Sequence, residues 1–158
     1  TLGHICFFFE KEKIAFTGDT LFSLGCGRIF EGTHEQMFQS LKKIKNLPKD
    51  TQIYCGHEYT EKNSRFCVKF DNKNQKLKEK INQINQKRLK NLPTIPSTLE
   101  DEINCNIFFR YDDHEVKSSL KMINSKSIEI FTKLRDLKDN FWIFNSWLKT
   151  SQVYIAIA

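Results

Sequence analysis

The sequence predicts an α+β fold in which a strand-containing first part is followed by an all-helical second part. Near the start, two short apolar runs flank a charged turn, which is the pattern of a β-hairpin. A strand, a helix and another strand then follow in order, which is half of an α/β layer. After about residue 70 the composition shifts to Lys, Asn and Gln, with apolar residues at helical spacing.

Composition and charge limit the classes of function. Hydrophobic residues make up 39% of the 158 residues, and 14 Phe side chains can build a core. The net charge of +6 favours an anionic partner, but the charges are interspersed, as on solvated helix faces. Five cysteines without C-x-x-C spacing indicate a reducing compartment, and no apolar run approaches the ~20 residues of a membrane span. We therefore expect a cytoplasmic protein, with the mitochondrion as the alternative, and neither membrane nor nucleic-acid partners.

The first elements follow from local signals. Strands are expected at Ile5–Phe9 and Ile14–Thr17, and Gly18-Asp19 ends the second of them. The segment Leu21–Gly32 is Gly-rich and is expected to be irregular. Thr33 with Gln36 forms a capping box for a helix that runs to about residue 44.

The remaining elements come from apolar periodicity and caps. A strand is expected at Gln52–Cys55 and a helix at Thr60–Phe70. The spacing of four apolar residues predicts a helix over Asn74–Lys90: Leu77, Ile81, Ile84 and Leu89. Ser97 or Thr98 can cap a short helix, and two later helices are expected near 114–123 and 125–141. The predicted division is therefore 1–70, 71–141 and a C-terminal extension, 142–158.

Two strand ends carry side chains that bind metals. Thr17-Gly18-Asp19-Thr20 and Cys55-Gly56-His57-Glu58 each place Gly and a ligand-type residue after a strand. Carboxylate oxygen and imidazole nitrogen are ligands for zinc and iron. From these pieces alone, an ordinary Gly-Asp turn and a structural histidine stay open as alternatives.

Longer strings around these strand ends resemble a known family. They are Phe16–Phe22, Gly25–Arg28, Glu31–Thr33, Tyr54–Thr60, Pro96–Leu99 and Lys138–Phe141. Together they resemble glyoxalase II, also called hydroxyacylglutathione hydrolase, of the metallo-β-lactamase superfamily, from residue 1 to about residue 141. The resemblance implies the C-terminal half of an αββα sandwich followed by an all-helical domain.

The resemblance also implies a site with two divalent metal ions, zinc first, with iron or manganese as alternatives. Asp19 matches the aspartate that bridges the metals, and His57 matches the last histidine ligand. His4 matches a histidine beyond the ligand, so we expect it to be structural. The His-x-His-x-Asp-His motif that supplies the other ligands is not in this sequence. We therefore expect the chain to begin within the fold and to be inactive alone.

By the same resemblance, the substrate is a glutathione thioester, S-D-lactoylglutathione, which is hydrolysed to glutathione and D-lactate by a monomer. Arg28, Phe30 and Tyr59 match positions that contact the substrate, although the family often has Tyr where Phe30 stands. Arg135 and Lys138 match the basic pair that holds the glutathione carboxylate. Their spacing puts them on one helix face, and we expect them to face the cleft of the metal ligands.

Two other functions are weighed against this one. A persulfide dioxygenase, or another enzyme of the same superfamily, would share the Gly-Asp turn, and substrate choice would distinguish it. A non-catalytic basic helical module could bind nucleic acid through 76–90, and steep salt dependence would reveal it. The tail 142–158 extends the last helix or forms an apolar, β-prone end.

Overall fold

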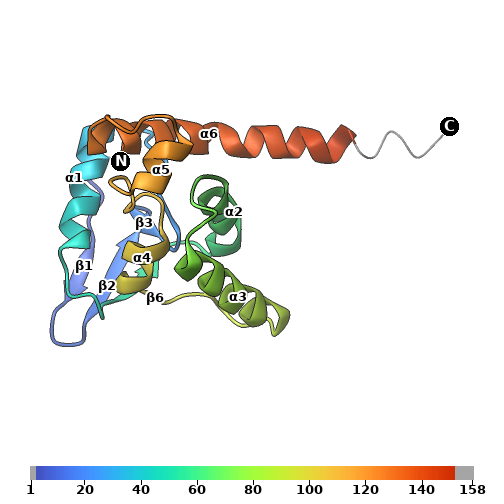
Figure 1. Cartoon of the computed structure of the whole chain (residues 1–158). Helices are drawn as coiled ribbons and strands as arrows, with labels where there is room; N and C mark the ends of the chain where they lie inside the picture. The colour runs from blue at the N-terminus through green and yellow to red at the C-terminus, as the bar shows by residue number, and fades with distance from the viewer. Residues whose placement is uncertain (1–2, 152–158) are drawn as a thin grey trace.

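The computed structural model describes residues 3–151, with the side chains of the last helix described as far as residue 141. Figure 1 shows the first helix alongside the sheet, and the last helix crossing one end of both. The strands and helices follow one another in this order: β1 Phe7–Phe9, β2 Ile14–Gly18, β3 Leu21–Phe22, β4 Gly25–Cys26, α1 His34–Lys45, β5 Gln52–Cys55, α2 Thr60–Phe70, α3 Gln75–Leu89, β6 Ser97–Thr98, α4 Leu99–Cys105, α5 His114–Ser119 and α6 Ser127–Ser151.

The main sheet has the strand order β1-β2-β5-β6. Strands β1 and β2 form the predicted hairpin, with Phe7 opposite Phe16. Strand β5 pairs with β2 in parallel, and α1 provides the crossover that a parallel pair requires. Strand β6 pairs antiparallel with β5 and was not predicted, because two residues are too few to show alternation. The fold class expected from the sequence is confirmed.

The Gly-rich segment is more regular than predicted. Strands β3 and β4 form a small antiparallel ladder with Leu21 opposite Cys26 and Phe22 opposite Gly25. The turn between them is made by Leu24 with a positive φ of 57°, a conformation that usually selects glycine. The prediction of an irregular segment missed this ladder because its strands are only two residues long.

The predicted caps and helices are largely confirmed. Thr33 caps α1 with both hydrogen bonds of a capping box, and Thr98 caps α4 by accepting from the Asp101 amide. Helix α3 buries Leu77 and Ile84, but Leu89, expected on the same apolar stripe, is 77% exposed because it lies at the helix end. Helix α5 is shorter than expected, and α6 continues past residue 141 to residue 151.

The core lies between the sheet, α1 and the later helices. Phe66, Phe108 and Phe131 are fully buried, and their rings contact one another or further aromatic rings. The contact between Phe38 and Phe131 joins segments 93 residues apart, so the core spans both halves of the chain. The predicted division at residue 70 stays a prediction.

No helix in the described part of the chain is both long and apolar enough to cross a bilayer. The apolar, β-prone stretch of the predicted extension, 153–158, lies outside the described residues.

Candidate metal and substrate site

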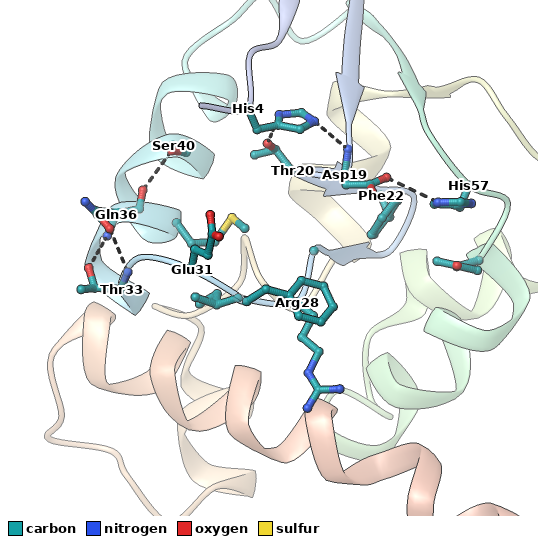
Figure 2. Close-up of a pocket in the computed structure, with 15 residues that line it drawn as sticks. His4, Asp19, Thr20, Phe22, Arg28, Glu31, Thr33, Gln36, Ser40 and His57 are labelled. Carbon is teal, nitrogen blue, oxygen red and sulfur yellow. Dashed lines mark hydrogen bonds and ion pairs between the residues drawn. The ribbon is translucent and has the colours of Figure 1, made fainter. Parts of the chain in front are cut away.

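Asp19 and His57 meet at the carboxyl ends of two adjacent parallel strands. Asp19 follows β2 and His57 lies two residues beyond β5, and the paired register ends at Gly18 and Cys55. The Asp19 Oδ1 and His57 Nε2 atoms are 3.7 Å apart, and both side chains are more than half exposed. Figure 2 shows them pointing toward one another. This convergence was expected from the sequence.

The neighbours of Asp19 fix its position. Gly18 has φ +48°, and a side chain there would lie 2.5 Å from His4 Nε2. The same His4 nitrogen accepts a hydrogen bond from the Asp19 amide at 3.2 Å, so in the neutral ring the other nitrogen carries the proton and donates to Thr20 Oγ1 at 3.1 Å. His4 therefore holds the backbone of Asp19 in place, and it also lines the cavity described below. Gly56 gives the carboxylate room, since a Cβ there would lie 2.6 Å from Asp19 Oδ1.

His57 is held in an aromatic group. Its ring stacks on Tyr59 with centroids 4.9 Å apart, and Phe22 meets Tyr59 edge-on at 5.3 Å. Glu58, the residue between His57 and Tyr59 in the sequence, accepts hydrogen bonds from both the amide and the hydroxyl of Thr94. These two bonds hold the pKa of the Glu58 carboxyl below its usual range. The loop that carries His57 is thus tied to the segment before β6.

A cavity of about 480 Å³ opens beside Asp19 and His57. Five residues predicted for the site line it: Asp19, Arg28, Phe30, His57 and Tyr59. Sequence reasoning missed the wall formed by α1, which contributes Gln36, Met37 and Ser40. The capping box and the apolar stripe gave Gln36 and Met37 other roles, and only the position of Ser40, four residues after Gln36 and three after Met37, could have indicated a shared face.

Arg28 extends from the cavity toward α6 (Figure 2). Its guanidinium carbon lies 5.6 Å from the Phe30 ring centroid, and its Nε lies 3.7 Å from Asp139 Oδ1. Phe30 is 76% exposed, so the cation and the ring form an open edge of the cavity.

Arg135 and Lys138 are not among the residues that line this cavity. Arg135 is buried behind the loop that carries Arg28, where its Nη1 donates to the Cys26 carbonyl at 2.8 Å. Its Nη2 donates to Asp139, which also faces Arg28. Lys138 Nζ lies 4.8 Å from the Phe66 ring centroid, and burial lowers the pKa of this amine to about 8. The structure therefore puts the basic pair in the interior next to the site. The expectation that both side chains face the cavity beside Asp19 and His57 is not met, because they pack against the Cys26 backbone and the Phe66 ring.

The donor set fits part of a metal shell. Asp19 and His57 offer one carboxylate and one imidazole on the same side of a cavity, which suits zinc, iron or manganese. Within residues 3–151, no group of three or more His, Cys, Asp or Glu side chains is arranged to hold a metal ion. A tight site needs three or four ligands, so these two residues are a partial shell.

Comparison with known proteins shows which families the two parts of the chain match. The model of the metallo-beta-lactamase superfamily matches residues 1–57, and the model described as "Hydroxyacylglutathione hydrolase C-terminus" matches residues 58–141. Hydroxyacylglutathione hydrolases of Pelagibacter ubique and Bartonella quintana are 59% and 46% identical to it over 141 residues, 89% of this chain. Those residues are 53% and 56% of the two relatives, so the chain spans about half the length of the curated relatives it matches.

The strand arrangement that brings Asp19 and His57 together, the helical region after it and the match of the superfamily model define the class: the C-terminal portion of a metallo-β-lactamase fold joined to helices. The chain belongs to the hydroxyacylglutathione hydrolase family, whose C-terminal model covers more than half of it. The family resemblance predicted from the sequence is confirmed.

Proposed function

We propose that this chain is the C-terminal part of an enzyme that hydrolyses the thioester S-D-lactoylglutathione, and related acylglutathiones, to glutathione and the free acid. The observation that supports this most is that Asp19 and His57 lie 3.7 Å apart beside a cavity edged by Arg28, Phe30 and Tyr59. The names of the relatives support the substrate class.

Asp19 and His57 would hold two divalent metal ions, zinc or alternatively iron or manganese. When bound, the metals supply a nucleophile from water at neutral pH and polarise the thioester carbonyl. The remaining ligands would come from the part of the relatives' length that this chain does not span. The hydrogen bond from the Asp19 amide to His4 would keep the carboxylate in place as metals bind.

The other cavity residues would bind the glutathione part. Arg28 presents a cation to an anionic substrate, and Phe30 offers an apolar face without the hydroxyl of a tyrosine. Tyr59 stands beside His57 and can orient the bound thioester. Holding these remote atoms positions the carbonyl at the metals.

Arg135 and Lys138 are proposed to complete the glutathione carboxylate site, as the resemblance implies. Arg135 also shares Asp139 with Arg28, so it can set the direction of the Arg28 guanidinium even without substrate contact.

The test measures bound metal and S-D-lactoylglutathione hydrolysis on this chain and on a version extended upstream to the length of the relatives. We expect the extended protein to bind about two metals and to turn over, and Asp19→Asn or His57→Gln to lose metal. Arg28→Met should keep its metal and raise KM about tenfold to 100-fold, because a charge-assisted contact is lost. The matched control is Arg65→Met, which changes an exposed arginine outside the cavity.

The same assay separates the alternatives. If the extended protein binds metal but leaves the thioester intact, the substrate assignment is refuted while the family assignment is retained. Oxidation of a glutathione persulfide in place of hydrolysis would favour the dioxygenase. If Arg28→Met and Arg65→Met behave alike, Arg28 has no role in binding the substrate.

A further inference from the structure

Four buried side chains from the helical part form hydrogen bonds with the backbone of the turn between β3 and β4. They are Asn63 and Cys67 of α2, Glu102 of α4, and Asn106, which caps the end of α4. We call these four residues the turn clamp. Neither the metal ligands nor the cavity wall includes any of them.

The turn clamp provides partners for five polar backbone groups of residues 22–25, four carbonyls and the Leu24 amide. Its amides and thiol donate to the carbonyls of residues 22–25: Asn106 Nδ2 to Phe22 at 3.3 Å and to Gly25 at 3.0 Å, Asn63 Nδ2 to Ser23 at 3.0 Å, and Cys67 Sγ to Leu24 at 3.3 Å. Glu102 Oε2 accepts from the Leu24 amide at 2.8 Å. Leu24 has a positive φ, so these bonds hold a backbone conformation that its side chain disfavours.

Glu102 is the centre of the turn clamp. Its side chain is fully buried, and the same oxygen that holds Leu24 also accepts from Asn106 Nδ2 at 2.9 Å. Burial raises the pKa of this carboxyl, and the hydrogen bonds from the Leu24 amide and Asn106 Nδ2 oppose the rise. A carboxyl is costly in such a place, so its retention calls for a role that an apolar side chain could not fill.

The ladder β3–β4 connects this turn to the cavity. At the opposite end from Leu24, the Gly27 amide donates to the Thr20 carbonyl at 3.2 Å. A Cβ on Gly27 would lie 2.0 Å from the Asp19 carbonyl oxygen, so the two backbones are in direct contact. Arg28 follows immediately. A shift of the turn therefore moves both Asp19 and Arg28, because two short paired strands transmit it over about 7 Å.

We propose that Glu102 is a positioning residue, which fixes the ladder β3–β4 through the Leu24 amide and thereby sets where Asp19 and Arg28 stand on the cavity wall. It acts from the helical part of the chain and touches neither substrate nor metal. The importance of Asp19 and Arg28 for catalysis rests on the proposed function, whereas the mechanical link does not.

The experiment measures native-state amide hydrogen exchange, residue by residue, in this chain. Glu102→Leu should accelerate exchange at Leu24 and Gly27 about tenfold more than at Ile53 of the central strand β5. Glu102→Gln should restore exchange to within about twofold of the original, because its amide oxygen can accept from Leu24. Glu100→Gln, on the exposed side of the same helix, is the control and should change neither site.

An equal acceleration at the Leu24, Gly27 and Ile53 amides would mean that Glu102 only stabilises the whole fold, and would overturn the proposal. Unchanged exchange at Leu24 and Gly27 would overturn it as well. If Glu102→Leu does not fold, Asn63→Ala removes a single bond of the turn clamp and must give the same local pattern.

In the upstream-extended protein, Glu102→Leu should also raise KM for S-D-lactoylglutathione about as Arg28→Met does, with Glu102→Gln rescuing it. If Glu102→Leu changes exchange locally but the extended protein without substitutions does not hydrolyse the thioester, the proposed function is refuted and the positioning role of Glu102 is retained.

Discussion

Gly18 should not tolerate a side chain, and the size of the loss can be worked out from its surroundings. Gly18→Ala places an L-residue at φ +48°, which costs about 1–2 kcal/mol. Its Cβ would also lie 2.5 Å from His4 Nε2, so the imidazole must move and give up its bond to the Asp19 amide, about 0.5–1.5 kcal/mol. We expect the free energy of unfolding to fall by about 2–3 kcal/mol.

Urea unfolding monitored by circular dichroism measures this loss, with Gly3→Ala as the control, since a Cβ on Gly3 would meet nothing within 4 Å. In a His4→Ala background the steric contact is absent, so Gly18→Ala should cost only the backbone part, about 1–2 kcal/mol. If the cost is the same in both backgrounds, the contact between His4 and Gly18 is not what selects glycine. A cost no larger than that of Gly3→Ala would refute the backbone argument as well.

Two further predictions concern the helical part. Thr98→Ala should lower the free energy of unfolding by about 1 kcal/mol, because the N-cap of α4 loses its acceptor, and an unchanged urea midpoint would contradict this. Burial lowers the pKa of Lys138 to about 8 from 10.5, so between these pH values the unfolded chain binds more protons at this lysine, and the contribution of Lys138 to stability rises by about 1 kcal/mol from pH 8 to 9. The buried thiols act in the opposite direction over the same pH range, because burial raises the pKa of Cys67 and Cys105 to about 12 and the folded chain keeps protons that the unfolded chain loses. The difference in the free energy of unfolding between the original chain and Lys138→Met, measured by urea unfolding from about pH 7.5 to 9, isolates the lysine and should rise by about 1 kcal/mol from pH 8 to 9. Equal slopes in the two proteins would rule out Lys138 as a contributor.

The convergence of Asp19 and His57 could be predicted from the sequence because its cause is local, whereas a role for them in binding metal is implied by the family resemblance. Asp19 and His57 each follow a recognisable strand, and parallel strands bring their carboxyl ends to one edge. The capping box of α1 is local in the same way, since Thr33 and Gln36 satisfy each other's backbone groups.

The burial of charged side chains could not be predicted in this way. The start of α4 reads Glu100-Asp101-Glu102, three acids that all favour a helix N-terminus, yet only Glu102 is fully buried. Likewise, the spacing of Arg135 and Lys138 puts them on one helix face without saying whether that face meets the cavity or the core. Whether Glu102 and Arg135 are buried depends on packing against segments about 80 to 110 residues away in the sequence. Helical periodicity carries no information on such long-range packing.

The strand order of the main sheet has a consequence for the chain as it is being synthesised. Strand β5 ends at residue 55, and its outer neighbour β6 begins at residue 97, so 41 residues must be made between them. At about 5–20 residues per second, the outer edge of β5 stays without its partner for roughly 2–8 s after it leaves the ribosome. An unpaired edge of this kind can pair with another nascent chain. This exposure ends only when residues 97–98 are made and β6 pairs with Gln52 and Ile53.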